Sequence, residues 1–211
     1  MFTGIVAAVG TVRAVKPARD GNRLVVDAGE LNLKDVAVGD SIAVNGVCLT
    51  VVARTARRFE ADVSRETLAC TAGFSAGSRA NLEKAMRLAD RIGGHLVSGH
   101  VDGVGTVARI KAAGGNRLLA VAAPKALAKY VTRKGSIAVN GVSLTVNAVN
   151  GAEFEANLIP HTLAASNLGE LSVGDRVNIE VDMLARYVER LSTTSHNVPS
   201  PTLRRRSHRG K

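Results

Sequence analysis

A histidine, a cysteine and a serine are the side chains of this sequence whose types and positions best suit chemistry. His100 stands in SGHV, and because an imidazole titrates near neutral pH it suits a base or proton shuttle. Cys48 follows an Asn-Gly pair and offers a thiol nucleophile. Ser143 follows a second Asn-Gly pair and, with Thr145, offers hydroxyl donors. Structural histidines, buried inert thiols and water-facing strand hydroxyls use the same residue types, so the arrangement of these residues must decide.

Two of these residues occupy the same position in a repeat. SIAVNGVCLTV at 41–51 returns as SIAVNGVSLTV at 136–146, an offset of 95 residues (136 − 41), with Cys48 against Ser143 as the one difference. Further matches at or near this offset are TGIVAAVGTV with SGHVDGVGTV, FEADV with FEANL, GNRL at 21–24 with GNRL at 115–118 (one residue out of step), and GSRANLE with GDRVNIE. The chain is a tandem duplication, with copies predicted at 1–92 and 93–182.

The two copies differ at positions where chemistry is expected. Besides Cys48 against Ser143, the unlike pairs are Ile5 and His100, Glu66 and His161, and Gly39 and Lys134. Two like molecules held by the two copies would therefore meet different groups. The duplication favours a function with two equivalent sites, in which one molecule acts as donor and the other as acceptor.

Strands are the elements that must position these residues. Short β-branched runs such as GTVRAV, RLVVDA and CLTVVAR alternate apolar with polar residues and are interrupted by Gly, Asn and Asp. About six strands fit in each copy, and a unit of this size cannot leave its sheet edges open. We therefore predict an all-β protein of two tandem six-stranded antiparallel Greek-key barrels. Asn45-Gly46 and Asn140-Gly141 predict tight hairpins, because Asn-Gly readily adopts the positive φ angles that such turns need.

The strand pattern ends after Asp182. In MLARYVERL the residues Leu184, Val188 and Leu191 recur at helical spacing, which predicts a short amphipathic helix over 183–191. That apolar stripe must be buried, either on its own chain or on a partner subunit. Residues 192–211 are predicted to form a disordered basic tail.

Charge and composition argue against nucleic acid as the partner. Five of the ten net positive charges lie in the tail, at Arg204, Arg205, Arg206, Arg209 and Lys211. Aromatic residues make up only 3% of the chain and Trp is absent, so little material exists for base-stacking surfaces. A basic barrel that binds polyanions through the tail is the weaker alternative.

Neither a metal nor an organic cofactor is predicted. The two cysteines, Cys48 and Cys70, lack metal spacing, and no carboxylate or thiol completes a metal set with His95 and His100. The pair Gly103 and Gly105 opens no helix, so the dinucleotide fingerprint is missing. The N-terminus has no secretory leader pattern, and no run approaches the roughly 18 apolar residues of a membrane span. We expect reduced thiols, no membrane contact and a cytoplasmic location.

Five motifs together resemble the riboflavin synthase family of the lumazine-dismutating type: MFTGIV, NGVCLTV, GGHLVSGHVDG, NGVSLTV and LIPHTL. The likeness extends from residue 1 to about residue 190. It implies two six-stranded barrels and a C-terminal helix that holds a homotrimer, with each active site between the N-terminal barrel of one subunit and the C-terminal barrel of another. It further implies lumazine synthase as a second partner.

The reaction that the resemblance implies is the last step of riboflavin biosynthesis. Two molecules of 6,7-dimethyl-8-ribityllumazine become riboflavin and 5-amino-6-(D-ribitylamino)uracil by transfer of a four-carbon unit, without metal or cofactor. A proton must leave the 7-methyl group of one lumazine, and the resulting charge spreads over the pteridine, so that the substrate is its own electron sink. The protein then has to orient two rings, donate hydrogen bonds and move protons.

The resemblance also assigns roles to single residues. His100 is the base or proton shuttle, and Ser143 and Thr145 donate hydrogen bonds to the lumazine that loses its proton. The nucleophile that activates the other lumazine is left open between Cys48, Ser41 and a bound water. Three further residues in the implied catalytic site are Lys134, which reaches across the subunit boundary, Asp182 and Phe2, which covers a ring. Without the resemblance these three would be read as a solvated turn lysine, a helix N-cap and a frayed end.

Substrate contacts are implied in both copies. Main-chain contacts to the pyrimidine edge are expected from Gly4, Ile5, Val6, Cys48, Leu49, Thr50, Gly99, His100 and Val101, and contacts around the second ring from Lys134, Ser143, Leu144 and Thr145. The ribityl chains are expected to bind Asp62, Val63, Ser64, Arg65, Glu66, Thr67, Leu158, Ile159, Pro160, His161, Thr162 and Leu163. Two positions depart from the family pattern, which has Glu where His161 stands and often Asp where Asn140 stands.

A non-catalytic lumazine or flavin carrier is the main alternative, because lumazine-binding fluorescent proteins resemble this family. Such carriers tend to lose site residues in one half of the chain. This sequence retains Cys48, His100, Ser143 and Lys134 together, which favours the enzyme.

Overall fold

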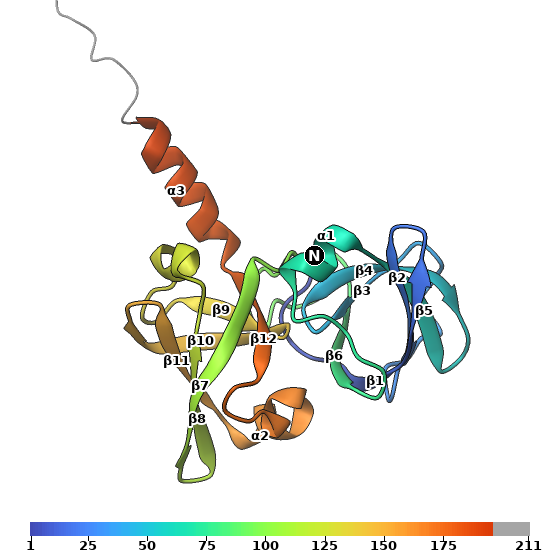
Figure 1. Cartoon of the computed structure of the whole chain (residues 1–211), viewed down its shortest axis with the longest axis horizontal. Coiled ribbons are helices and arrows are strands. Elements are labelled where there is room, and N and C mark those ends of the chain that lie inside the picture. The colour runs from blue at the N-terminus through green and yellow to red at the C-terminus, as the bar shows by residue number, and fades with distance from the viewer. Residues whose placement is uncertain (196–211) are drawn as a thin grey trace, which may run out of the picture.

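The computed structural model describes residues 1–195, which form two β-barrels followed by a projecting helix (Figure 1). Barrel 1 closes in the order β1-β2-β5-β4-β3-β6, with every neighbouring pair antiparallel. Its elements are β1 (Ala8–Ala18), β2 (Gly21–Asp27), β3 (Ser41–Val44), β4 (Val47–Arg54), β5 (Arg58–Ser64), α1 (Arg65–Cys70) and β6 (Arg79–Lys84).

Barrel 2 repeats this architecture and closes in the order β10-β11-β8-β7-β12-β9. Its elements are β7 (Gly103–Ala113), β8 (Asn116–Ala122), the 3-10 helix η1 (Lys125–Tyr130), β9 (Ser136–Val139), β10 (Val142–Asn150), β11 (Glu153–Leu158), α2 (Pro160–Ala165), η2 (Asn167–Glu170) and β12 (Arg176–Val181). The predicted fold class of two six-stranded antiparallel barrels is confirmed.

Each barrel has its own apolar core, because alternate strand residues point inward. Phe59 is fully buried in barrel 1, and its equivalent Phe154 is 1% exposed in barrel 2. The register corrects one alignment made on letters alone. Leu24 pairs with Val15 and Leu119 pairs with Ile110, so the first hairpins keep the offset of 95 and the GNRL match joins residues that are not equivalent.

The two Asn-Gly pairs form the predicted tight turns and also meet each other. The φ angles are 49° at Asn45, 78° at Gly46, 46° at Asn140 and 77° at Gly141, the paired positive values of a two-residue hairpin. A Cβ built on Gly46 would lie 2.7 Å from the Gly141 nitrogen, and one on Gly141 would lie 2.7 Å from the Gly46 nitrogen. Equivalent residues in mutual contact indicate a local two-fold axis between the barrels.

Asparagines hold the barrels together at this axis. The Asn81 side chain donates to the Asn140 carbonyl at 2.9 Å, and the Asn178 side chain donates to the Asn45 carbonyl at the same distance. Asn81 and Asn178 are each 2% exposed. Since buried amides are costly unless they are hydrogen-bonded, this reciprocal pattern specifies one way of joining the barrels.

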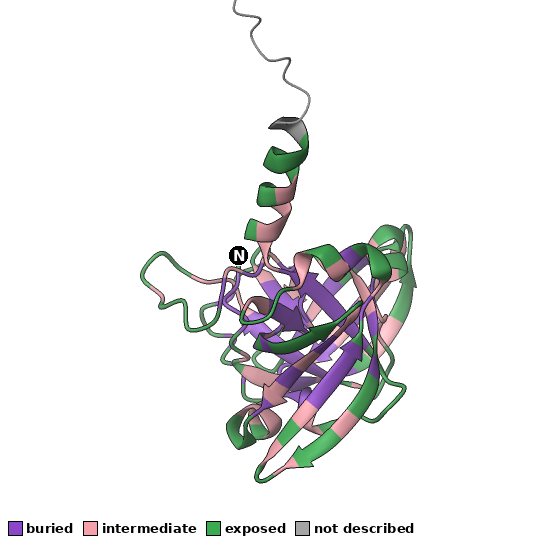
Figure 2. Cartoon of the chain, turned by 90° about the vertical axis from the view of Figure 1, so that its left-hand side faces the viewer, coloured by how far each residue is buried: buried purple, intermediate pink, exposed green. Residues whose placement is uncertain are grey.

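The C-terminal helix is longer than predicted. α3 spans Met183–Ser195, so residues 192–195, predicted as the start of the tail, are helical. The Asp182 side chain accepts a hydrogen bond from the Leu184 amide at 3.0 Å, as expected of an N-cap. Figure 2 shows exposed and half-buried residues along this helix, which stands away from the barrels. Residues 196–211, and with them the cluster of basic tail residues, lie outside the described part of the chain. Within residues 1–195 no helix is long and apolar enough to cross a membrane.

Candidate active site in two equivalent cavities

Two cavities occupy equivalent positions in the two halves of the chain. The first, here the Cys48 cavity, has a volume of about 220 Å³ and is lined by Val47, Cys48, Glu66, Thr67, Cys70, Thr71, Gly99, His100 and Val101. The second, here the Ser143 cavity, has a volume of about 90 Å³ and is lined by Val142, Ser143, His161, Thr162, Ala165, Ser166, Gly4, Ile5 and Val6. Every residue of one set is 95 positions from its counterpart in the other, so the structure contains two copies of one site.

Each cavity is completed by the leading segment of the other copy. The Cys48 amide donates to the Gly99 carbonyl at 2.9 Å, and the Ser143 amide donates to the Gly4 carbonyl at 2.8 Å. Val101 packs on the core of barrel 1 and Val6 on the core of barrel 2. Segments 99–101 and 4–6, here the two roof segments, are thus exchanged between the barrels. As a result, His100 shares a cavity with Cys48, and the Ser143 cavity receives Ile5.

Glycine is required where each roof segment crosses its barrel. Gly4 and Gly99 have φ angles of 74° and 79°, which L side chains rarely adopt. A Cβ on Gly4 would lie 2.6 Å from Cβ of Ser143, and one on Gly99 would lie 2.6 Å from Cβ of Cys48. The side chains of Cys48 and Ser143 therefore lie directly against the backbone of the roof segments.

A buried glutamate anchors each roof segment. Glu83 accepts the amide and hydroxyl protons of Thr3, both at 2.7 Å, and the amide of Gly4 at 3.0 Å. Glu180 repeats this with the amide and hydroxyl of Ser98, at 2.7 and 2.6 Å, and with the Gly99 amide at 2.9 Å.

Burial raises the pKa of Glu83, and the three hydrogen bonds oppose that shift. Neither glutamate was among the predicted site residues. The repeat GSRANLE/GDRVNIE, which keeps a glutamate among core-facing residues, was the signal that could have identified them.

A histidine supports Ser143. His95 Nδ1 lies 2.7 Å from Ser143 Oγ, and the ring is only 9% exposed. Burial lowers the pKa of His95, although Asp182 and Glu180 act in the opposite direction, so the ring is neutral near pH 7. In the tautomer protonated at Nε2, Nδ1 accepts the hydroxyl proton of Ser143. His95 was considered at the sequence level only as a metal ligand, and its partnership with Ser143, 48 residues away, has no local signal.

Some of the residues predicted to contact the substrate line the two cavities, and others have side chains in the barrel cores. Glu66, Thr67, His161 and Thr162 line the cavities. Leu49, Val63, Leu144 and Leu158 point into the barrel cores, and Leu163 packs on the core of barrel 2. Strand alternation and core packing turn these five side chains inward, so a ligand contact at these positions would have to come from the main chain, as predicted for Leu49.

The remaining members of the two ribityl segments have structural partners or lie outside the cavities. Asp62 forms a paired salt bridge with Arg23 at 2.7 and 2.8 Å, and Arg65 lies 3.5 Å from Asp20. The Ser64 hydroxyl caps α1 by accepting the Thr67 amide proton at 3.1 Å. Pro160 is the first residue of α2, and Ile159 is 48% exposed. Thr50 and Thr145, which were predicted to contact the lumazine rings, are exposed strand residues that do not line either cavity.

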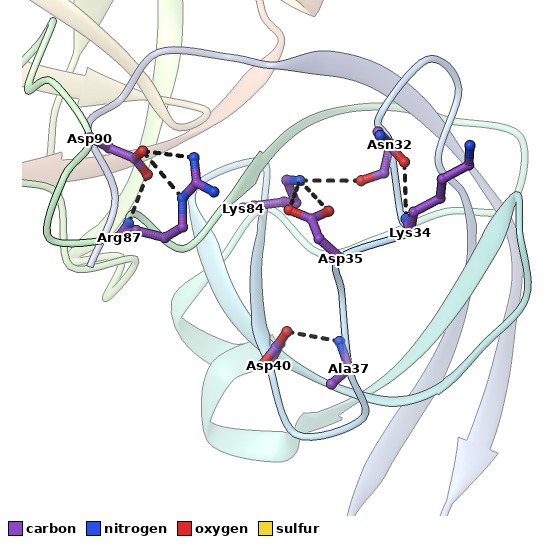
Figure 3. Close-up of polar contacts among 8 residues, drawn as sticks. All are labelled: Asn32, Lys34, Asp35, Ala37, Asp40, Lys84, Arg87 and Asp90. Atoms are coloured by element: carbon purple, nitrogen blue, oxygen red, sulfur yellow. Dashed lines mark hydrogen bonds and ion pairs between the residues drawn. The ribbon is translucent and has the colours of Figure 1, made fainter.

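Ser41 lies in a different cavity from Cys48. This cavity, of about 360 Å³, is lined on barrel 1 by Ala7, Asp35, Val36, Asp40, Ser41, Glu83, Lys84, Ala85, Arg87 and Asp90. Figure 3 shows that its charged groups bind one another: Lys84 lies between Asp35 and the Asn32 carbonyl, and Arg87 pairs with Asp90. The hydrogen bond from Lys84 lowers the pKa of Asp35. Ser41 and Cys48 were predicted as alternative nucleophiles for the same lumazine. Because they line two separate cavities, a molecule bound in one cavity would meet only one of them.

Phe2 has neither of the roles considered for it. The side chain is fully buried, and its backbone forms an antiparallel bridge with Val97, which is its equivalent at an offset of 95. It packs with Val97, Ala43 and Ala138 in a small cluster between the barrels. Phe2 is a core residue on the local two-fold axis, and the prediction that it covers a substrate ring is wrong because no face of its ring is accessible.

Lys134 has an unusual backbone. Its φ is 69°, its side chain is exposed, and its amide donates to the Val146 carbonyl at 2.8 Å. The equivalent residue in copy one is Gly39, which has a φ of 100° and makes the same bond to Val51. A lysine in the left-handed region costs about 1–2 kcal/mol that glycine at the equivalent position does not incur.

Comparisons with known proteins agree with this arrangement. The lumazine binding domain family matches residues 3–85 and 98–182. The chain is 48% identical to riboflavin synthase of Photobacterium phosphoreum, covering 90% of this chain and 88% of that protein. It is 43% identical to riboflavin synthase of Brucella abortus, covering 91% and 98% of the two chains.

Solved structures of LumP resemble the whole fold. The complex of LumP with riboflavin matches with a TM-score of 0.79 at 26% identity, over 86% of this chain and 99% of that one. Its complex with 6,7-dimethyl-8-(1'-D-ribityl) lumazine matches with a TM-score of 0.77 at the same identity and coverage. The repeated domain and the relatives at 43–48% identity together show that the chain belongs to the riboflavin synthase family.

Proposed function

We propose that the protein converts two molecules of 6,7-dimethyl-8-ribityllumazine into riboflavin and 5-amino-6-(D-ribitylamino)uracil by transfer of a four-carbon unit. One observation carries this proposal: two cavities related by the repeat present unlike chemistry to like molecules. One cavity holds Cys48, Glu66 and His100, while the other holds Ser143, His161 and Ile5. A reaction between two identical substrates needs this kind of asymmetry, because one must lose a proton and the other must accept carbon.

The two cavities divide the proposed roles. With neutral His95 protonated at Nδ1, the Ser143 hydroxyl is free to donate a hydrogen bond to the lumazine that becomes the anion; with His95 protonated at Nε2, the hydroxyl proton goes to His95 and Ser143 can only accept. Cys48 lines the other cavity and is one candidate for the nucleophile that activates the second lumazine, with Ser41 and a bound water as the alternatives. Since His100 opens into the Cys48 cavity, it reaches the molecule in a Ser143 cavity only if that cavity belongs to another subunit and faces it. This requirement supports an active site between subunits, with Lys134 and Asp182 at its edge.

Assembly as a homotrimer is part of the proposal. Leu184, Val188 and Leu191 on α3 are 64%, 64% and 67% exposed, so no part of residues 1–195 buries the predicted apolar stripe. A partner subunit is then the means of covering it. We place the enzyme in the cytoplasm and retain lumazine synthase as a protein partner. The proposed chemistry requires neither a metal nor a cofactor, because the pteridine ring delocalises the charge.

A carrier function is the alternative that the LumP likeness favours, at 26% identity. Incubation of the pure protein with 6,7-dimethyl-8-ribityllumazine alone separates the two. We expect riboflavin absorbance to grow and 5-amino-6-(D-ribitylamino)uracil to appear in equal amount. Tight binding of the lumazine without product would overturn the enzyme proposal in favour of the carrier.

Truncation at Ser200 tests the remaining alternative of polyanion binding through the basic tail. The truncated protein is expected to keep its turnover, because every residue assigned above lies before position 196. Loss of turnover together with loss of polyanion binding would contradict the proposal.

A further inference from the structure

One arginine on the C-terminal helix contacts a roof segment. Arg186 Nη2 lies 2.7 Å from Asp102 Oδ2 and donates to the His100 carbonyl at 3.3 Å. His100 itself lines the Cys48 cavity, and Asp102 follows it by two residues. A residue of the projecting helix is therefore in direct contact with the wall of the proposed active site.

Asp102 makes this contact rigid. Its side chain is 14% exposed, and Oδ2 also accepts the Val181 amide proton at 2.8 Å. Its own amide donates to the Ile179 carbonyl at 2.8 Å. A carboxylate held this way by β12 offers Arg186 a fixed anchor, and charge-assisted bonds of this type are the stronger ones. The guanidinium is therefore held at the end of segment 99–101.

The position of Arg186 leaves one of its nitrogen atoms without a hydrogen bond to the described part of the chain. Arg186 Nε is buried and has no hydrogen-bond partner among residues 1–195. An unsatisfied buried donor of a charged group is unfavourable by about 1–3 kcal/mol or more. A surface arginine that merely neutralised Asp102 would avoid this cost by keeping Nε in water. Nε thus lies buried against the protein although the side chain as a whole is 38% exposed.

The contact exists on one side of the local two-fold axis. At the offset of 95, His100 and Asp102 correspond to Ile5 and Ala7. After β6, copy one continues through residues 85–102 without a helix, so no counterpart of α3 or of Arg186 lies there. Ile5 and Ala7 carry no charge, so within residues 1–195 the roof of the Ser143 cavity makes no equivalent ion pair. The tether accompanies His100, the residue that distinguishes the two roofs.

α3 has a second polar attachment that does not involve the roof. Glu189 binds the side chains of Lys129 and Tyr130 on η1. This attachment also joins α3 to barrel 2, one turn further along the helix, and it supplies a matched control. Loss of Glu189 removes one attachment of α3 but leaves the contacts of Arg186 with Asp102 and His100, whereas loss of Arg186 releases His100.

We propose that Arg186 is a positioning residue, which fixes the backbone at His100 from α3 and so couples the placement of that helix to the Cys48 cavity. The proposal rests on the proposed function in that His100 acts on bound lumazine. Because α3 also carries the exposed apolar stripe, any partner that covers the stripe sets the position of Arg186. The geometry of the roof is then most defined in the assembled protein.

The experiment compares Arg186→Ala, Arg186→Lys and Glu189→Gln in the full-length protein. A misplacement of about 1 Å at a catalytic group is enough for losses near 100-fold, so we expect Arg186→Ala to lower kcat by 10- to 100-fold with KM changed less than threefold. Arg186→Lys is expected to recover part of kcat, because an ammonium still pairs with Asp102. Glu189→Gln should leave kcat within twofold of the parent protein. Equal losses in Arg186→Ala and Glu189→Gln would overturn the proposal, since both would then act only by holding the helix.

A second readout does not depend on turnover. The His100 ring signal, identified in the NMR spectrum of histidine-labelled protein by its loss in His100→Gln, is expected to shift and broaden in Arg186→Ala but not in Glu189→Gln. An unmoved signal would overturn the positioning role. Absence of riboflavin formation by the parent protein would instead overturn the proposed function, while the ring signal still tested the contact.

Discussion

His95 Nδ1 and Ser143 Oγ lie 2.7 Å apart, in a cavity whose counterpart presents Cys48 beside His100. A neutral imidazole bonded to a serine hydroxyl is suited to proton transfer, whereas a thiol is suited to addition. Duplication thus produced two similar cavities, and a few substitutions made them chemically unlike.

His95→Gln is expected to lower kcat by about 10²–10⁴-fold, because glutamine hydrogen-bonds Ser143 but cannot take its proton. Ser143→Ala should cause a similar loss, and the double variant little more, since the two residues act as a unit. Steady-state kinetics measure the losses, and riboflavin binding by fluorescence serves as the control. Losses that simply multiply in the double variant would contradict a shared role.

Stability should depend on pH through His95. Its pKa in the folded protein is below the ordinary value near 6.5, so between these two values the unfolded chain binds one more proton than the folded chain. The free energy of unfolding is therefore full above pH 6.5 and falls as the pH falls from 6.5 toward the folded-state pKa. Urea unfolding of the parent protein and of His95→Gln between pH 5 and 8 measures this. A parent protein whose pH dependence equals that of the variant would refute the assignment.

Glu83→Gln and Glu180→Gln test the anchors of the two roof segments. In either variant an amide NH₂ group replaces one of the two accepting oxygens. This donor then faces a buried backbone N–H, which loses its hydrogen-bond acceptor. Each change is expected to lower the free energy of unfolding by about 1–3 kcal/mol. The functional effects should be crossed: Glu180→Gln loosens the roof of the Cys48 cavity, and Glu83→Gln that of the Ser143 cavity. Denaturant titrations and hydrogen exchange at Gly99 and Gly4 would show whether each variant affects the opposite barrel.

Lys134→Gly separates stability from activity. Glycine removes the strain of the left-handed backbone but has a more flexible unfolded state, so the net gain is about 0.5–1 kcal/mol. Activity is expected to fall, because the side chain is proposed to reach the substrate. Gly39→Ala, the control at the equivalent position, should destabilise the protein. A more stable variant with full activity would remove Lys134 from the proposed site.

Assembly is tested on the exposed stripe of α3. Leu184→Asp with Val188→Asp should convert a trimer to single chains of 22.0 kDa by light scattering, since charges on an apolar contact oppose its burial. The far-UV spectrum of the barrels should be unchanged, because both side chains are exposed in the single chain. Riboflavin formation should be lost with the trimer. Active single chains would place the whole site within one subunit.

Several features could be read directly from the sequence, because they depend on neighbours along the chain. The period of two in GTVRAV and CLTVVAR predicted strands, Asn45-Gly46 and Asn140-Gly141 predicted tight turns, and the spacing of Leu184, Val188 and Leu191 predicted α3. The repeat at 41–51 and 136–146 predicted two like barrels. Glu66 and His161 were predicted as unlike partners, and both line the equivalent cavities.

What the sequence alone did not determine is how the two copies share their parts. His100 lines the cavity of Cys48, Ser143 lies beside His95, and Glu83 binds Thr3, and each of these relationships joins residues 48 to 80 positions apart. These contacts arise only when closed barrels meet at a two-fold axis and exchange segments 4–6 and 99–101. The same closure turned Val63 and Leu158 into their cores and buried Phe2. Local patterns report the period and turns of a chain, whereas the contents of each cavity follow from packing between elements distant in sequence, which no local pattern encodes.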